Sequence, residues 1–269
     1  MTIKLNQKIN KIISLYFPNI DLEKTQFYEG FDFVTVIIDQ LALRFPKNQD
    51  SVKKLKTEKM LLKFLAEEAN FSIPEYQANS NKFFSCYPVI RGEELTLDFY
   101  NSLTEIKKNK LCEDLAVFML KIHSLKLPEN ISSKIPIANW SKIYLEIKKD
   151  IDVYLYPSKS NEKFLALFKD FSSGKRRVAL VHSDLSGDNI IINKTKKRIE
   201  GIIDFSDMCF SDPDVDFAHF WYFGEKMVKK VVFFYTKDKN ERKLILRNSK
   251  LYSTYIKYLM MIIENKKGV

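Results

Sequence analysis

The stretch VHSDLSGDNIII, from residue 181 to residue 192, places polar side chains between two apolar flanks. One residue separates His182 from Asp184, Asn189 follows Asp184 by five positions, and Asp204 follows it by twenty. A carboxylate such as that of Asp184 can orient an attacking hydroxyl and take its proton. Mg²⁺ prefers oxygen ligands, which the Asn189 amide and the Asp204 carboxylate supply. These residue types are what the transfer of a phosphoryl group to a hydroxyl requires.

The residue spacing excludes three other kinds of site: a hydrolase triad, a calcium-binding loop and a zinc site. His182, Ser183 and Asp184 are adjacent, so on an extended chain they cannot converge as a hydrolase triad, and no G-x-S-x-G turn is present. The run DPDVD (212–216) begins like a calcium loop but has Phe217 where that loop needs glycine. The histidines lack the spacing of zinc ligands: His123, His182 and His219.

The spacing H-x-D-x-x-x-x-N, formed by His182, Asp184 and Asn189, is that of the kinase catalytic loop. The run IIDFSD around Asp204 is similar to the D-F-G element of the same enzymes. Each element alone occurs by chance. Together, in this order and each beside a β segment, they indicate phosphoryl transfer.

Hydrophobic periodicity predicts the elements that position these residues. The segments 189–193 and 198–205 form a hairpin that brings the loop carrying Asp184 and Asn189 toward Asp204. The other expected strands are 33–38 and 41–45, joined by a turn at Asp39–Gln40, then 82–90 and 177–182. The expected helices are 1–17, one from Asp50 or Ser51 to about Ala69, one from a capping box at Ser102 and Glu105 to about His123, then 139–155, 161–171 and most of the chain from Asp214.

This outline is an α+β fold with two lobes. The small N-terminal lobe, residues 1–90, is rich in strands, and the larger lobe, residues 91–269, is mostly helical. Glycine is scarce, with 7 in the chain, so each one marks a backbone requirement or an ordinary turn; the ones of interest are Gly30, Gly92, Gly187 and Gly201.

Bulk composition bounds the class of protein. The chain has 269 residues, 45% of them hydrophobic, and no apolar run approaches the roughly 20 residues of a membrane span. The N-terminus lacks the apolar core of a signal peptide. Three scattered cysteines without metal spacing are expected to be reduced thiols: Cys86, Cys112 and Cys209. We therefore expect a cytoplasmic protein with no membrane partner.

The net charge of +10 is concentrated near the C-terminus, where residues 221–269 carry 12 Lys and Arg against 4 Asp and Glu. One interpretation is a surface that binds nucleic acid. The other is a solvated face on lysine-rich helices, which we favour because no nucleic-acid-binding motif accompanies the charge.

The block from residue 181 to residue 220 closely resembles the aminoglycoside phosphotransferase family, whose fold is similar to that of protein kinases. The resemblance extends, in order, to YEGFDFVTVIIDQLALRFPK (28–47), YPVIRGEEL (87–95) and LKIHSLKLP (120–128). The first of these is most like the 2″-phosphotransferase subgroup.

The resemblance implies a role for each matching residue. Asp184 would be the catalytic base, and Asn189 and Asp204 would bind Mg²⁺. His182 would hold the catalytic loop, and Asp216 would brace that loop from the following helix. The other two histidines carry no role from the resemblance: we expect His123 to be a satisfied residue at a helix end and His219 to pack on a helix beside Trp221.

The resemblance also implies a nucleotide site in the small lobe. Glu58 would pair with the basic residue of the third strand, which here is Arg44 in place of the usual lysine, with Lys47 as the fallback. The glycine-rich loop is reduced to Gly30. At the hinge, the Pro88 carbonyl and the Ile90 N–H would contact a purine edge.

The function expected from this resemblance is transfer of the γ-phosphoryl group of ATP or GTP, with Mg²⁺, to a hydroxyl of an aminoglycoside, as in antibiotic resistance. The alternatives are a kinase of another small alcohol (a macrolide, or a choline- or homoserine-like compound) and a catalytically silent nucleotide-binding module. A monomer is expected. A polycationic acceptor needs carboxylates, for which the candidates are Glu146, Asp150, Asp152, Glu162, Asp170, Asp207, Asp212 and Asp214.

Overall fold

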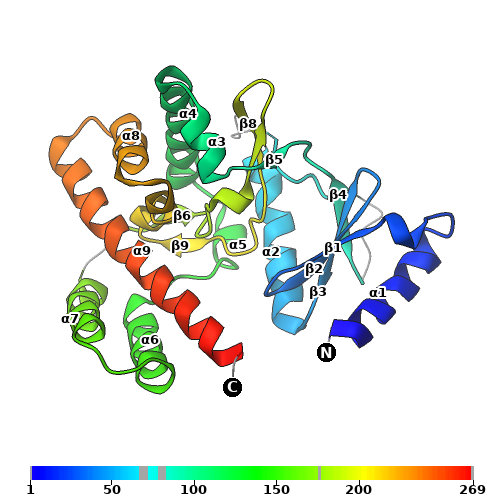
Figure 1. Cartoon of the computed structure of the whole chain (residues 1–269), viewed down its shortest axis with the longest axis horizontal. Coiled ribbons are helices and arrows are strands. Elements are labelled where there is room, and N and C mark those ends of the chain that lie inside the picture. Colours follow the sequence, from blue (N-terminus) through cyan, green and yellow to red (C-terminus); the bar gives the residue numbers. More distant parts are fainter. Residues whose placement is uncertain (1, 67–71, 78–82, 175–176, 268–269) are drawn as a thin grey trace.

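A computed structural model describes residues 2–66, 72–77, 83–174 and 177–267 of the chain. Two parts lie side by side (Figure 1). The N-terminal part contains a four-stranded sheet with helices α1 and α2, and the C-terminal part is mostly helical. The α+β class and the two-lobed arrangement expected from the sequence are confirmed.

The sheet of the N-terminal part is antiparallel, with strand order β1-β2-β3-β4. The strands of this sheet are β1 (Gln26–Glu29), β2 (Phe33–Ile38), β3 (Leu41–Pro46) and β4 (Ser85–Pro88). The helices of the N-terminal part are α1 (Thr2–Tyr16) and α2 (Gln49–Leu65). The predicted turn between β2 and β3 is present, and Asp39 adopts the positive φ of 52° that a tight hairpin turn favours. Ile9 and Ile13 of α1 are buried in one cluster with Val36 and Leu43 of the sheet.

Two helices begin at other residues than the sequence indicated. Asn48, rather than Asp50 or Ser51, caps α2, because its side chain accepts a hydrogen bond from the Ser51 amide. Thr104, rather than Ser102, caps the helix that follows it, by accepting from the Lys107 amide. In both cases the cap lies three residues before the amide that it satisfies.

The C-terminal part carries two small sheets among its helices. One has the strand order β5-β7-β8 and the other pairs β6 with β9. The strands are β5 (Glu93–Glu94), β6 (Ala179–Val181), β7 (Ile190–Asn193), β8 (Arg198–Ile202) and β9 (Cys209–Ser211). The helices are α3 (Leu97–Ser102), α4 (Glu105–Ser124), α5 (Glu129–Ser132), α6 (Trp140–Tyr154), α7 (Lys159–Ser173), α8 (Glu225–Tyr235) and α9 (Lys239–Lys267). Short 3₁₀ helices are η1 (Leu22–Lys24), η2 (Gly187–Asn189), η3 (Pro213–Phe217) and η4 (His219–Phe223).

The predicted hairpin of β7 and β8 is confirmed, with Ile190 opposite Ile202. Two backbone hydrogen bonds join this hairpin to Ser72. The Ser72 amide donates to the Glu200 carbonyl, and the Ile202 amide donates to the Ser72 carbonyl. A segment that precedes residue 90 therefore adds to the sheet of the C-terminal part. The division at residue 90 stays a prediction.

The core of the C-terminal part surrounds α4, which buries Leu115, Phe118 and Met119. A second cluster joins α6, α7 and α9 through stacked rings, among them Phe164 on Tyr258 and Phe168 on Tyr255. Among the described helices, not one is long and apolar enough to cross a membrane.

Candidate active site

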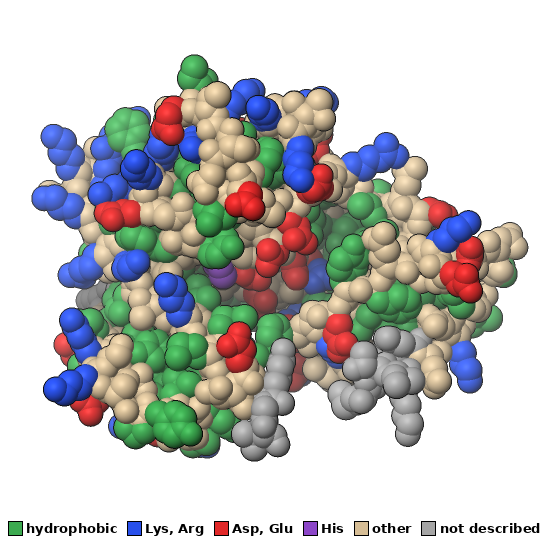
Figure 2. Space-filling view, viewed as in Figure 1, with side chains coloured by type: hydrophobic (Ala, Val, Ile, Leu, Met, Phe, Trp, Pro, Cys, Tyr) green, Lys and Arg blue, Asp and Glu red, His purple; other side chains and the backbone are tan. Residues whose placement is uncertain are grey.

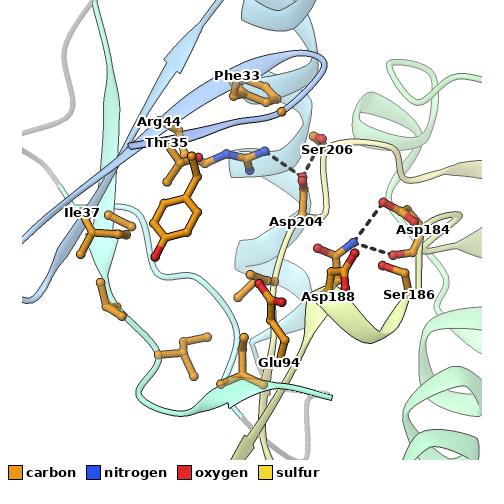
Figure 3. Close-up of a pocket in the computed structure, with 18 of the residues that line it drawn as sticks. Phe33, Thr35, Ile37, Arg44, Glu94, Asp184, Ser186, Asp188, Asp204 and Ser206 are labelled. Atoms are coloured by element: carbon orange, nitrogen blue, oxygen red, sulfur yellow. Dashed lines mark hydrogen bonds and ion pairs between the residues drawn. The ribbon is translucent and has the colours of Figure 1, made fainter. Parts of the chain in front are cut away.

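A cleft with a volume of about 1020 Å³ lies between the sheet and the catalytic loop. Arg44 extends into it from the sheet toward Asp204, and Asp184, Ser186 and Asp188 face it from the other side (Figure 3). The residues predicted from the sequence that line this cleft are Gly30, Arg44, Ile90, Asp184, Asn189 and Asp204.

The backbone before Asp184 is held in a strained conformation. Ser183 has a φ of 73°, in the left-handed region that costs a non-glycine residue roughly 1–3 kcal/mol. The Asp216 carboxylate offsets this cost, because it accepts hydrogen bonds from the His182 amide at 3.0 Å and the Ser183 amide at 2.8 Å. These two hydrogen bonds, which we call the backbone clamp, fix the direction of the chain between the end of β6 and Asp184.

Asp216 is itself fixed by His123, whose Nε2 lies 3.0 Å from the carboxylate while Nδ1 lies 2.9 Å from the Tyr235 hydroxyl. Burial acts to raise the pKa of Asp216, but the hydrogen bond and charge of His123, together with the charge and backbone amide of His182, lower it overall. The His182 ring is fully buried against Phe205, at 4.8 Å between centroids, and its Nε2 lies 3.3 Å from the Ile203 carbonyl.

Asn189 is tied directly to Asp184. Its Nδ2 donates to the Asp184 carbonyl at 2.8 Å and to the Asp184 carboxylate at 3.0 Å. These two bonds use both N–H groups of the amide, and the Oδ1 atom accepts no hydrogen bond from a described residue. The amide oxygen is therefore available to a cation in the cleft.

Asp204 lies at the end of the segment after β8 and also has a positive φ, of 59°. Its Oδ1 accepts from Arg44 at 2.7 Å and from the Ser206 hydroxyl at 2.8 Å. Burial acts to raise the pKa of Asp204, but the adjacent guanidinium and the hydroxyl lower it overall. The carboxylate is thus ionised at neutral pH.

Arg44, on β3, bonds to side chains of three other segments of the chain. Only 3% of its surface is exposed, and its NH1 donates to both Glu58 oxygens at 2.7 and 2.8 Å and to the Tyr76 hydroxyl at 3.2 Å. Its NH2 donates to Asp204. The two carboxylates raise the pKa of Arg44 well above its usual value against the opposing effect of burial. A planar guanidinium can bridge two carboxylates in this way, whereas a lysine ammonium is a point charge.

Lys47, the alternative basic residue, does not reach Asp204. Its ammonium pairs with Glu29 at 2.9 Å and donates to the Gly30 carbonyl at 2.6 Å, which ties β3 to the β1–β2 turn. A Cβ on Gly30 would meet only the Phe33 carbonyl oxygen, at 3.5 Å. The chain's own packing therefore does not require glycine at this turn.

The hinge differs from the expected arrangement in one respect. Val89 and Ile90 line the cleft, but Pro88 is exposed and does not. The Val89 amide donates to the Gln40 carbonyl at 2.8 Å. The Ile90 amide donates to no described residue, so it is available to a ligand.

His219 is a site residue that the sequence did not reveal. It lies in η4 together with Trp221, and its ring also reaches the catalytic loop. Its Nε2 lies 3.2 Å from Asp184 Oδ1. Burial lowers the pKa of His219, although Asp184 opposes the shift. Asp216 lies in η3 and His219 in the next 3₁₀ helix, η4, and both contact the catalytic loop.

The cleft is acidic although the protein is basic. Acidic side chains gather in the hollow between the two parts, and most basic ones lie on the outer surface of the view in Figure 2. Arg44 is the only Lys or Arg among the described residues that line the cleft. The lining carboxylates are Glu29, Asp32, Glu93, Glu94, Asp184, Asp188, Asp204 and Asp207. A polyphosphate can enter such a site only with cations that neutralise it.

Most of the carboxylates that the sequence suggested for a polycationic acceptor lie outside the cleft. The acidic residues of α6 and α7 do not line it. Asp207 does line the cleft and pairs there with Lys54 at 2.7 Å. Asp212 is buried and accepts from the Tyr252 hydroxyl, and Asp214 is buried and accepts from Arg177 and Asn248. These two carboxylates support the fold.

The chain is similar to a family of phosphotransferases and to several solved structures. A model of the APH phosphotransferase enzyme family matches residues 25–239. The GDP complex of wild-type aminoglycoside 2'-phosphotransferase-IIIa has a TM-score of 0.79 and 23% identity, covering 97% of this chain and 98% of that chain. The gentamicin complex of APH(2")-IIa has a TM-score of 0.76 and 21% identity, covering 97% and 94%. Macrolide 2'-phosphotransferase MphH from Brachybacterium faecium has a TM-score of 0.71 and 15% identity, covering 96% and 92%.

Proposed function

Because the chain belongs to the APH phosphotransferase enzyme family, we propose that it transfers the γ-phosphoryl group of ATP or GTP to a hydroxyl of a small-molecule acceptor. One observation carries this proposal. Asp184, Asn189, Asp204 and Arg44 converge on one cleft, with Asn189 bonded to Asp184 and Arg44 bonded to Asp204. Phosphoryl transfer depends on positioning and charge stabilisation, which these groups provide.

In this proposal Asp184 orients the acceptor hydroxyl and takes its proton. The Asn189 amide holds one carboxylate oxygen of Asp184 and His219 holds the other, so the base has a fixed direction. His182 and Asp216 support the same loop from behind through the backbone clamp at residues 182 and 183. Because the carboxylate is already oriented, no further conformational entropy is lost in orienting it during the reaction.

Arg44 is proposed to contact the phosphates of the nucleotide, with Glu58 fixing its guanidinium. Its NH2 already points at an oxyanion, the Asp204 carboxylate, in the cleft. The exposed turn at Gly30 would cover the phosphates, and the free Ile90 amide would contact the base. Pro88 would restrict the hinge from outside the cleft.

The residues present fit Mg²⁺. The Asn189 amide oxygen, which accepts from no described residue, and the ionised Asp204 carboxylate are hard oxygen donors that line the same cleft. No group of three or more His, Cys, Asp or Glu that could hold a metal occurs in the described part of the chain. Mg²⁺ suits such a sparse site, because it is usually bound by one or two carboxylates together with water and substrate phosphates. When bound, it neutralises phosphate charge.

Two acceptor classes follow from the sequence and the comparisons. An aminoglycoside is the class that the sequence resemblance implies, and the solved relatives include a kanamycin complex and a gentamicin complex. A macrolide is the second, since macrolide 2'-phosphotransferases also share the fold. The carboxylates expected on α6 and α7 do not line the cleft, which removes part of the support for the first class.

A catalytically silent nucleotide-binding module is the competing function. It would keep the nucleotide contacts of Arg44 and Ile90 but would not need Asp184 and His219 paired at the other side of the cleft. The test is release of ADP or GDP with Mg²⁺ and a panel of hydroxyl acceptors, comparing the natural chain with Asp184→Asn. We expect the variant to bind nucleotide normally and to lose transfer by roughly 10²-fold or more. Near-normal transfer by the variant contradicts the assignment of the base.

A further inference from the structure

A second cavity, of about 600 Å³, opens beside the cleft. We call it the side cavity. It shares Ser186 and Asp188 with the cleft, and His219, whose Nε2 contacts the Asp184 carboxylate, lies in its wall. A molecule of drug size fits a cavity of this volume. A hydroxyl compound bound there would thus lie next to the proposed base.

One wall of the side cavity is apolar and aromatic, whereas Thr96, Ser186 and Ser253 add hydroxyl groups to its lining. The 3₁₀ helix η4 supplies Trp221, Tyr222 and Phe223, and Leu95 and Ile256 face them from the chain before α3 and from α9. Tyr222 is 72% exposed, and its ring meets that of Phe223 edge-on with 5.3 Å between centroids. Exposed rings on a cavity wall leave apolar surface that a bound molecule can cover.

The charges in the side cavity are few and of mixed sign. Asp188 is the one carboxylate and Lys257 the one ammonium among the described residues that line it. Lys257 has no ion-pair partner among described residues. A second ammonium, that of Lys250, lies 4.2 Å from the centre of the Trp221 ring. Burial lowers the pKa of His219, so its ring adds no negative or positive charge at neutral pH.

A polycation would fit this cavity poorly. It would place several ammonium groups near Lys257, with Asp188 as the one compensating carboxylate among the described residues of the wall. It would also cover the rings of Trp221 and Tyr222 with strongly hydrated groups. An apolar molecule gains from the same surface, because it removes the rings from water.

We infer that the side cavity selects a hydroxyl acceptor with an apolar or aromatic face and at most one positive charge, and that it disfavours polycationic aminoglycosides. The inference rests on the proposed function, because it assumes that the acceptor reaches Asp184 through this cavity. Lys257 and Tyr222 are the residues that determine the selectivity, since one excludes added positive charge and the other offers exposed apolar surface.

The test measures binding and transfer separately. Kanamycin serves as the polycationic probe and erythromycin, a mostly apolar macrolactone with one amine, as the apolar probe. Their dissociation constants are measured by calorimetry with Mg²⁺ and ADP present, for the natural chain and for the double variant Tyr222→Asp/Lys257→Glu. We expect the natural chain to bind erythromycin at least roughly tenfold more tightly than kanamycin. We expect the double variant to shift this ratio toward kanamycin by roughly tenfold or more.

A charge reversal on the same helix serves as the control. Lys243→Glu changes an exposed lysine of α9, four turns before Lys257, and should leave the ratio unchanged. Kanamycin binding as tightly as erythromycin, binding of neither probe, or an unchanged ratio in the double variant overturns the inference. The two proposals fail differently. Selective binding without nucleoside diphosphate release counts against the proposed function alone, and efficient transfer to kanamycin counts against the inference alone.

Discussion

His219 Nε2 lies 3.2 Å from Asp184 Oδ1, across 35 residues of sequence. The histidine therefore holds the carboxylate oxygen that Asn189 leaves free, because Asn189 donates to Oδ2. Burial lowers the pKa of His219, although the charge of Asp184 opposes the shift, so at neutral pH a neutral imidazole contacts the carboxylate. The pair joins the cleft to the side cavity.

The first prediction concerns this pair. His219→Ala should lower kcat by roughly tenfold to a hundredfold, because Asp184 loses a fixed direction. The KM for nucleotide should change little, since His219 does not line the cleft. His219→Gln keeps a side-chain N–H donor and should restore part of kcat. Steady-state kinetics with both substrates, alongside the melting temperature, separates orientation from stability, and an unchanged kcat in His219→Ala would contradict the positioning role.

The second prediction concerns Arg44. Arg44→Ala leaves the buried Glu58 carboxylate without its partner and should lower the free energy of unfolding by about 3–5 kcal/mol. Arg44→Lys keeps the charge but not the planar fork that spans Glu58 and Asp204. It should fold and raise the KM for nucleotide by roughly tenfold.

Lys47→Ala is the matched control for Arg44. Its ion pair with Glu29 is partly exposed and should contribute about 1 kcal/mol or less. Urea unfolding and nucleotide kinetics on the three variants test the assignment. A larger rise of the nucleotide KM in Lys47→Ala than in Arg44→Lys would show that Lys47 is the phosphate contact.

The third prediction concerns two glycines of the site. A Cβ on Gly187 would lie 2.4 Å from the Leu95 carbonyl oxygen and 2.9 Å from the Phe223 ring, so Gly187→Ala must shift the loop between Asp184 and Asn189. Overpacking of this kind should cost about 1–3 kcal/mol and lower kcat. Gly30→Ala meets no close atom of the chain and should change stability by about 0.5 kcal/mol or less. Equal loss of kcat in both variants would contradict the prediction that close packing requires glycine at residue 187 but not at residue 30.

The fourth prediction concerns pH. Burial, and next the charge of Asp212, raise the pKa of Asp214 from 3.8 to about 6. The folded state therefore holds a proton between these values that the unfolded state has released, so this group's contribution to stability is present below pH 3.8 and lost as the pH rises to about 6. The shift corresponds to about 2–3 kcal/mol.

Asp214→Asn removes this titration. Relative to the natural chain, the free energy of unfolding of the variant should rise by about 2–3 kcal/mol between pH 4 and pH 7 in urea titrations. Asp152→Asn, at an exposed position on α6, removes the same charge without the burial and serves as the control. A difference that stays constant with pH would show that Asp214 is ionised throughout.

The sequence by itself determined the part of the site that is local. The spacing from His182 to Asn189 lies within one loop, and a hairpin with its turn between Asn193 and Arg198 returns the chain toward Asp204. Apolar periodicity and turn residues were enough to predict these elements, because their pairing depends on near neighbours. The cap positions were less certain from sequence, since Asn48 and Thr104 compete with other polar residues nearby.

The tertiary structure decided the contacts between distant segments. Arg44 meets Asp204 across 160 residues, and the side cavity is built from segments near Leu95, Trp221 and Lys257. Which faces meet depends on the packing of whole helices and sheets, and no local spacing encodes it. For the same reason the carboxylates of Asp212 and Asp214 support the fold rather than an acceptor. The sequence thus indicated phosphoryl transfer, and the packing of remote elements determined the shape of the cleft and of the side cavity.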